Sequence, residues 1–166
     1  MKDTKSILKK SKFSKKKVDC IFLYTDGGIN GGNPGNAGAG VYIIYPEYQQ
    51  EISEFVGFGT NNFAELKAIE IGLIKLLNQG YIDFPIRLYS DSKYSLGVLI
   101  NKNWNPTKNL ELIKDIRGVI QNFSRLTMYH VKGHAGNYGN EKADKLATFG
   151  KNKVIINRKI KNKKFI

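Results

Sequence analysis

The stretch VDCIFLYTDGG, residues 18–28, decides the fold that we predict for this chain. Residues 18–24 form an almost continuous apolar run, which is typical of a central strand buried on both faces of a sheet. The run stops at Thr25-Asp26-Gly27-Gly28, so the sequence predicts a strand that carries Asp26 at its C-terminal end. A loop rich in glycine and asparagine is then expected from Gly27 to Gly40.

The rest of the chain predicts one mixed-sheet α/β domain around that strand. Apolar or alternating runs predict further strands at residues 41–45, 51–58, 86–89 and 126–131. Helical periodicity predicts a helix over residues 61–78 and a short helix that follows Ser92 and ends at residue 100. It predicts two further helices over about 107–121 and about 138–149. The expected sheet therefore has five strands, with helices that flank it.

Length and composition limit the class of protein. A chain of 166 residues fits one domain with its own hydrophobic core. No apolar run approaches the roughly 20 residues that cross a bilayer, and no apolar stretch follows the lysine-rich N-terminus to make a secretory signal. Cys20 is the only cysteine, which excludes an internal disulfide framework. We therefore predict a cytoplasmic monomer with no membrane partner.

The net charge of +13 is concentrated at the two ends of the chain. Residues 1–17 hold eight lysines and one aspartate, while residues 151–166 hold six lysines, one arginine and no acid, so each end carries +7. Residues 18–150 hold 12 basic and 13 acidic groups, a net charge of −1. We interpret the ends as basic tails, the first of them disordered, on a domain formed by residues 18–150. Such tails bind polyanions through counterion release, although solubility or a genome rich in A and T would also explain them.

Glu65 is the acidic residue that is hardest to explain structurally. At 100° per residue, its predicted helix places Ile69 and Leu76 around it, while Lys67 and Lys75 lie on other sides. A buried carboxylate without a partner is costly unless it is protonated or bound to a cation. We therefore predict that Glu65 is a functional residue.

Three further acids fall at positions where they can join Glu65. Asp26 and Asp91 each end an apolar strand, where open α/β sheets place their ligands, and Asp144 borders the apolar stripe of the last predicted helix. Taken alone, Asp26 could start a turn, Asp91 could cap a helix, and Asp144 could be a solvated surface acid. Taken together, carboxylates that meet at one sheet edge repel each other unless divalent cations neutralise them. Oxygen ligands favour Mg²⁺ or Mn²⁺, so the four acids predict a site for such ions.

Several segments between residues 18 and 149 resemble ribonuclease H type 1, in the order in which that family carries them. These segments are YTDGG (24–28), GNPGNAG (32–38), TNNFAEL (60–66), YSDSKY (89–94), VKGHAG (131–136) and NEKADKLA (140–147). The resemblance implies a ribonuclease H-like α/β fold with three antiparallel strands followed by two parallel ones. It also implies an endonuclease that cuts the RNA strand of an RNA·DNA hybrid.

The resemblance assigns roles to the residues of the site. Asp26, Glu65, Asp91 and Asp144 would hold two Mg²⁺ ions, with Mn²⁺ as a substitute, which activate a water and stabilise the leaving 3′ oxygen. The products would carry 5′-phosphate and 3′-hydroxyl ends. His134 matches the family's mobile histidine, which assists proton transfer or product departure. A loop histidine without a role is the alternative.

The same resemblance implies residues that bind the hybrid. Amide groups suit the reading of 2′-hydroxyl groups because they both donate and accept hydrogen bonds. The matching positions are the backbone of Gly27 and Gly28 and the side chains of Asn33, Asn61 and Asn62, with Thr60 and Asn109 for a phosphate of the DNA strand. Lys93 stands where the family usually has glutamine, which would replace a 2′-hydroxyl contact by a phosphate contact. Turn and cap chemistry is the alternative explanation of the asparagines.

The chain departs from many members of that family in its basic surfaces. The path from Asp91 to Asn109 is short and lacks the extra basic helix and loop, the handle, with which many members grip the hybrid. Residues 1–17 have no room for the hybrid-binding domain of eukaryotic relatives. We therefore expect the two basic tails to supply non-specific affinity for nucleic acid.

Three other functions are compatible with parts of the sequence. A catalytically silent module that binds RNA or hybrids would explain the tails, but all four carboxylates are present. An integrase or resolvase would explain the acids but not the TNNFAEL and VKGHAG segments. The ribonuclease H portion of a reverse transcriptase is a third alternative, against which Met1 and the end at Ile166 favour a free-standing enzyme.

Overall fold

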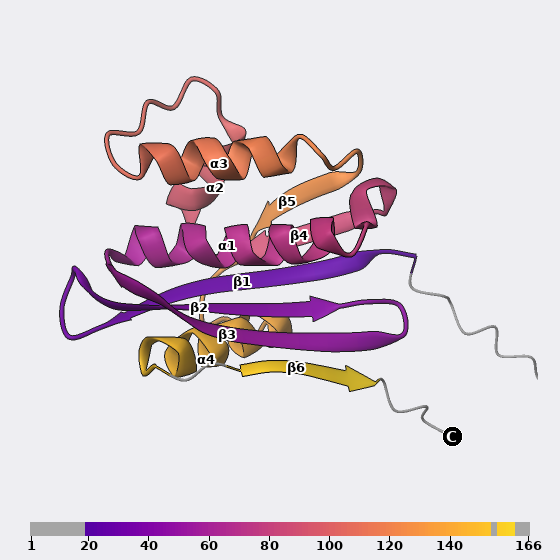
Figure 1. The fold of residues 1–166 in the computed structure, drawn as a ribbon, viewed down its shortest axis with the longest axis horizontal. Coiled ribbons are helices and arrows are strands. Elements are labelled where there is room, and N and C mark those ends of the chain that lie inside the picture. Colours follow the sequence, from indigo (N-terminus) through magenta and orange to yellow (C-terminus); the bar gives the residue numbers. More distant parts are fainter. Residues whose placement is uncertain (1–18, 154–155, 162–166) are drawn as a thin grey trace, which may run out of the picture.

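The computed structural model describes residues 19–153 and 156–161, which form one sheet with helices on both faces (Figure 1). In chain order the elements are β1 (Ile21–Asn30), β2 (Gly35–Ile44), β3 (Tyr48–Gly59), α1 (Asn61–Asn78), η1 (Tyr81–Asp83), β4 (Ile86–Ser90), α2 (Lys93–Ile100), α3 (Leu110–Ile120), β5 (Leu126–His130), α4 (Tyr138–Lys151) and β6 (Ile156–Lys161). The predicted N-terminal tail, residues 1–17, lies outside the described residues.

The sheet has the strand order β5-β4-β1-β2-β3-β6. β1, β2 and β3 pair antiparallel, whereas β4 and β5 add to β1 in parallel, so the predicted α/β mixed sheet is confirmed. α1 packs on one face of β1 and β2, with α3 against it, and α4 covers the opposite face (Figure 1). The site-bearing strand β1 is therefore central and covered on both sides.

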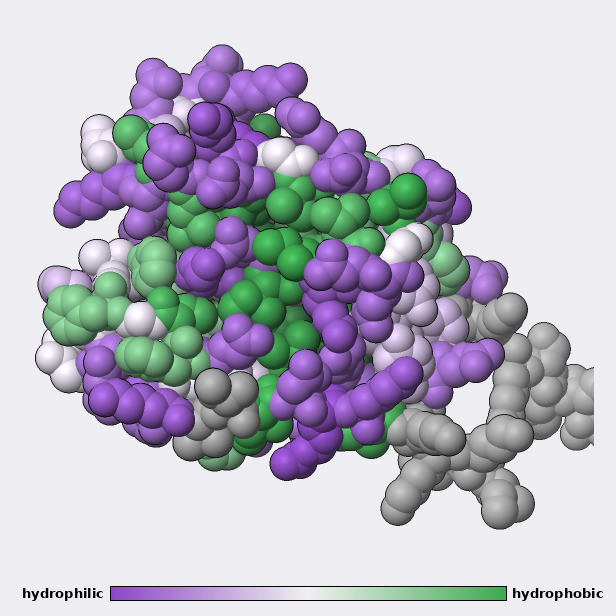
Figure 2. All heavy atoms as spheres, in the orientation of Figure 1, coloured by the Kyte–Doolittle hydropathy of each residue, from purple (hydrophilic) through white to green (hydrophobic). Residues whose placement is uncertain are grey.

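The hydrophobic core lies between the sheet and α1. Alternating residues of β1 and β2, such as Leu23 and Val41, meet the apolar stripe of α1, including Ile69 and Leu73. All four side chains have no solvent exposure, and burial of each contributes about 1.5–3 kcal/mol. Figure 2 shows hydrophilic side chains over the outer side of α3 and a band of hydrophobic ones between α3 and α1.

Two strands are longer than the sequence predicts, because glycines there serve close packing rather than a loop. The expected loop from Gly27 to Gly40 is strand for most of its length, and only residues 31–34 separate β1 from β2. A Cβ added to Gly38 would lie 2.0 Å from the backbone nitrogen of Lys151, and one added to Gly40 would lie 2.0 Å from the carbonyl oxygen of Ala143. Glycine within a strand often marks such an approach of another backbone, here that of α4.

The sheet also has six strands rather than the predicted five. β6 pairs antiparallel with the outer edge of β3, from Ser53↔Ile156 to Tyr48↔Lys161. It comes from the stretch that the sequence indicated only as a basic tail. The unpaired backbone groups of β3 provide the physical reason, because an open edge accepts a further strand whatever the charge of its side chains. α4 itself continues to Lys151, two residues beyond the helix end expected at about residue 149.

Within the ranges 19–153 and 156–161, no helix combines the length and the apolar character that crossing a membrane requires.

Candidate active site

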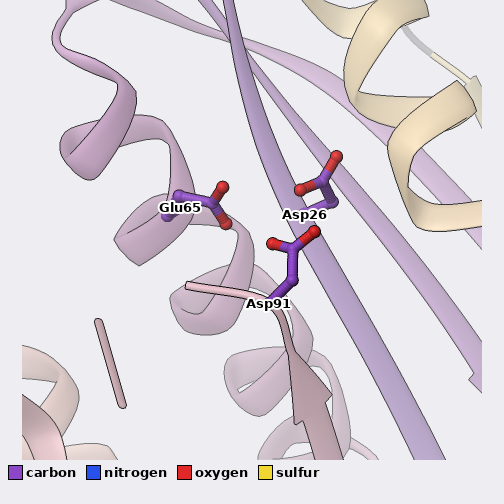
Figure 3. A group of neighbouring side chains, drawn as sticks. All are labelled: Asp26, Glu65 and Asp91. Carbon is purple, nitrogen blue, oxygen red and sulfur yellow. The ribbon is translucent and has the colours of Figure 1, made fainter. Parts of the chain in front are cut away.

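Three carboxylates from three different elements meet beside the centre of the sheet. Asp26 lies within β1, Glu65 lies in the second turn of α1, and Asp91 directly follows β4. One carboxylate oxygen from each lies within 4.8 Å of the other two, and the three side chains point toward one another (Figure 3). The parallel pairing of Thr25 with Ser90 places Asp26 beside Asp91, because each aspartate is the next residue in the chain after one member of that pair.

Gly27 is what allows Glu65 to reach this group. A Cβ at Gly27 would lie 2.1 Å from the backbone nitrogen of Glu65, so only glycine lets α1 approach β1 so closely. The helix begins at the cap formed by Thr60, whose Oγ1 accepts a hydrogen bond from the Phe63 backbone N–H at 3.2 Å. The predicted placement of Glu65 on the apolar face is thus realised, with only 4% of the residue exposed.

The electrostatics of the three acids favour a bound cation. Burial, and then the charges of Asp91 and Asp144, raise the pKa of Asp26 to about 8. Burial, followed by the charges of Asp26 and Asp91, also raises the pKa of Glu65 well above its usual value. Among the described residues, Oε2 of Glu65 is buried and has no hydrogen-bond partner. Such an oxygen is stabilised by protonation or by a cation, and an all-oxygen donor set fits Mg²⁺ or Mn²⁺.

Asp144 approaches the group from α4, on the opposite side of β1 from α1. Its charge and a side-chain hydrogen bond both contribute to the raised pKa of Asp26, and it lines the same hollow as the other acids. It lies outside the compact set of three oxygens. The structure therefore brings all four predicted acids to one site, with Asp144 at its α4 side.

Asn140 is a residue whose contact with the site the sequence did not predict. One turn before Asp144, it is almost fully buried, and its Nδ2 donates a hydrogen bond to Oδ2 of Asp91 at 3.2 Å. Asn137 caps the N-terminus of α4, because its side chain accepts a hydrogen bond from the Asn140 backbone N–H. Asn140 thus orients Asp91 from a different element. The sequence did hold a sign of this contact, because Asn140 lies one helical turn from Asp144 on the same side of the helix.

His134 lies in the loop between β5 and α4, at a positive φ of 50°. Its side chain is exposed and lines the same hollow of about 530 Å³ as the carboxylates. Gly133 brings this loop against Asp91, since a Cβ there would lie 2.7 Å from Oδ2 of Asp91. The histidine is placed where it can reach a molecule bound at the acids.

The residues predicted to bind the hybrid line two neighbouring hollows. The hollow of the carboxylates is also lined by Gly27, Gly28, Asn61, Asn62 and Lys93. A second hollow of about 360 Å³ is lined by Asn33, Thr60 and Asn109, and it shares Asn61 and Asn62 with the first.

Some of these side chains have structural partners and some do not. Thr60 caps α1, and Oδ1 of Asn33 accepts a hydrogen bond from the Asn61 backbone N–H at 3.4 Å, so cap and turn chemistry explains part of both. Asn109 stands at the N-cap of α3 with φ of 58°, but its side chain makes no capping hydrogen bond. Its amide is therefore available to a ligand.

Known proteins that resemble this chain in sequence and fold belong to one family. The sequence model of the RNase H family matches residues 18–152. The chain belongs to the RNase H family. It is 35% identical to the ribonuclease H of Ruthia magnifica over 146 residues, which cover 81% of this chain and 97% of that protein. It is 38% identical to the ribonuclease H of Acetivibrio thermocellus over 141 residues, which cover 77% and 92%.

Solved structures of the RNase H family share the fold. RNase H1 from the archaeon Halobacterium salinarum is 26% identical, with a TM-score of 0.66, covering 81% of this chain and 99% of that one. LC11-RNase H1, whose structure was solved in complex with an RNA/DNA hybrid, is also 26% identical, with a TM-score of 0.61, covering 77% and 96%. The RNase H fold predicted from the sequence is thus confirmed.

Lys151 is a further residue at the site that the sequence analysis assigned elsewhere. We predicted it as the start of the C-terminal tail, yet it is the last residue of α4 and lines the hollow of the carboxylates. The helical spacing offered a signal, because Lys151 follows Asp144 by seven residues, or nearly two whole turns.

Proposed function

We propose that this chain is an endoribonuclease that hydrolyses the RNA strand of RNA·DNA hybrids and leaves 5′-phosphate and 3′-hydroxyl ends. The observation that carries the proposal is the convergence of Asp26, Glu65 and Asp91, with an oxygen of Glu65 buried without a partner. A purely structural cluster of like charges would destabilise the fold without compensation, whereas a catalytic site needs these groups together.

The donor set fits divalent metal ions, and we assign them as two Mg²⁺ ions, for which Mn²⁺ can substitute. Asp26, Glu65, Asp91 and Asp144 would hold them. When bound, such ions supply an activated water and charge stabilisation for phosphodiester hydrolysis. The protein's own contribution is to fix the four carboxylates from β1, α1, β4 and α4, and to orient Asp91 through Asn140.

The remaining residues of the two hollows bind and position the substrate in this proposal. Asn61 and Asn62 stand between the hollows and present amides that can recognise 2′-hydroxyl groups. Asn33 and the backbone of Gly27 and Gly28 act on the RNA strand, Lys93 contacts a phosphate, and Thr60 and Asn109 hold a phosphate of the DNA strand. His134 assists proton transfer or product departure from its exposed loop.

The basic ends of the chain contribute affinity for nucleic acid and take no part in catalysis. Residues 1–17 and 151–166 each carry +7 and would bind nucleic acid non-specifically through counterion release. We also propose that the protein works as a monomer in the cytoplasm. A single cysteine, which cannot form a disulfide within the chain, fits such a reducing compartment.

Cleavage assays on matched duplexes test the proposal. Labelled RNA·DNA hybrid, double-stranded RNA and double-stranded DNA are incubated with the protein and Mg²⁺ or Mn²⁺. We expect only the RNA of the hybrid to be cut, and we expect Asp91→Asn to abolish cutting. Asp115→Asn, an exposed acid of α3 away from the site, serves as the control and should cut normally. Hybrid that is bound but never cut would indicate the silent binding module instead, and equal cutting of DNA duplex would overturn the substrate assignment.

A further inference from the structure

Lys151 occupies a position in the site that is fixed by the fold. It is the last residue of α4, on the same face as Asp144. Its Cδ and Nζ atoms lie 3.5 and 3.6 Å from where a Cβ would stand on Gly28. The aliphatic stem therefore runs along β1 beside Gly28, and the ammonium group reaches the hollow that holds the carboxylates.

The backbone that carries Lys151 is held on two sides. Its nitrogen lies so close to Gly38 of β2 that a Cβ there would be 2.0 Å away. The next residue, Asn152, accepts a hydrogen bond through Oδ1 from Nδ2 of Asn30 at 3.2 Å, which ties the end of α4 to the end of β1. A side chain on so fixed a base loses less freedom when it binds a ligand than one on a mobile tail.

Within the part of the chain that the structure describes, the ammonium group of Lys151 makes no ion pair. In residues 19–153 and 156–161 the ion pairs are Lys67–Glu70 and Lys142–Glu51. The basic side chains that line the hollow of the carboxylates are Lys93, His134 and Lys151, with Lys151 alone coming from the α4 side. Of the other described basic residues of the C-terminal stretch, Lys153 precedes β6 and its ammonium group lies 6.0 Å from the centre of the Phe55 ring, whereas Arg158 and Lys159 belong to β6 at the edge of the sheet.

We propose that Lys151 binds a phosphate of the RNA strand beside Gly28, as a substrate-binding residue of the catalytic site. This inference rests on the proposed function. Four carboxylates repel a polyanion, and a cation at the α4 wall offsets that repulsion where the strand passes Gly28. The ammonium group takes no part in bond breaking, so it acts on binding and leaves the chemical step unchanged.

A simpler role is available and can be separated by experiment. A lysine in the last turn of a helix interacts favourably with the helix dipole, which would affect stability but not substrate binding. Lys151→Met keeps most of the aliphatic stem and removes the charge, while Lys151→Arg keeps the charge. Lys145→Met is the matched control, because Lys145 is an exposed residue of the same helix and lines none of the hollows described above.

Steady-state cleavage of an RNA·DNA hybrid is measured for these variants from about 50 to 200 mM salt, together with Tm. For Lys151→Met we expect KM to rise about 5- to 10-fold with kcat unchanged, and the dependence of log(kcat/KM) on log salt to flatten by about 0.7–0.9. Lys151→Arg and Lys145→Met should stay within about twofold of the original protein in KM.

Three results would overturn the inference: a KM for Lys151→Met equal to that of Lys145→Met, a loss confined to kcat, or a lower Tm with normal kinetics. The original protein is assayed on the same hybrid in each experiment. If it fails to cut, the proposed function is wrong; if it cuts and Lys151→Met matches the control, only the role of Lys151 is wrong.

Discussion

The centre of the sheet and its β6 edge both carry charge, but they hold it in opposite ways. At β1 and β4 the acids are packed together, and Asp26 and Glu65 are only 7% and 4% exposed. On β6, Arg158 and Lys159 are exposed, and the Lys159 ammonium rests 4.1 Å from the centre of the Tyr48 ring. Buried charge is costly and demands a specific partner, whereas exposed charge costs little and is screened by salt. The comparison separates the proposed catalytic centre from the edge that we propose binds nucleic acid through its charge.

The substitution Asp26→Asn is expected to have the largest effect and tests the buried acids at the centre of the sheet. We expect hybrid cleavage to fall by about 10³-fold or more, because a ligand of the proposed metal site is lost. We expect Tm in EDTA to rise at the same time, because one of several like charges has been removed. Activity and thermal denaturation are measured on the same preparation. Retained cleavage, or a lower Tm, would contradict the view that this centre trades stability for function.

Stability against pH gives a smaller effect that is specific to the centre. The pKa of Asp26 is raised to about 8 in the folded protein, whereas a free aspartate titrates near 4. The folded state then keeps a proton that the unfolded chain has released, so this stabilisation is complete below about pH 4 and is lost as the pH rises through about 8.

We therefore expect Tm in EDTA to fall by several degrees between pH 6 and 8.5, and Mg²⁺ to restore more of it at pH 8.5 than at pH 6. Protons compete with the metal at the lower pH, which explains the difference. Asp26→Asn should flatten the pH profile and serves as its control. A Tm that rises over this range in EDTA would show that the acids are stabilised by something other than protons or metal.

The smallest expected effect belongs to the edge. Replacing Arg158 and Lys159 together by glutamine should raise KM for the hybrid about twofold to threefold at 0.1 M salt, with kcat unchanged, and the difference should vanish as salt rises. Lys75→Gln, in the last turn of α1, is the control for a lost surface charge. A change in kcat would place β6 in the chemistry and break the division between edge and centre.

Much of the centre could be predicted from the sequence because its signals are local. The apolar run before Asp26 predicts a buried strand, and the helical wheel alone places Glu65 on an apolar face. Asp91 follows its strand as predicted. The prediction that Asp26 ends its strand is less exact, because β1 continues past it to Asn30. Local patterns cannot show that Gly27, Gly38 and Gly40 face the backbones of helices that follow much later in the chain.

The edge could not be predicted, because its structure depends on a distant partner. Residues 156–161 contain three basic side chains and read as a solvated tail. They form a strand because β3 offers free backbone groups about a hundred residues earlier, and Nε2 of Gln50 donates to Oδ1 of Asn157 at 2.8 Å. The contact of Lys151 with the site was missed for the same reason, since it depends on how α4 lies across β1 and β2.

β6 has a consequence for how copies of the protein meet one another. Without it, β3 would expose a row of free N–H and C=O groups, to which an identical strand from a second molecule can add. With it, the outermost strand on that side bears Arg158 and Lys159, and two such edges repel each other. We therefore expect β6 to disfavour the edge-to-edge association of two sheets in a concentrated solution of the protein.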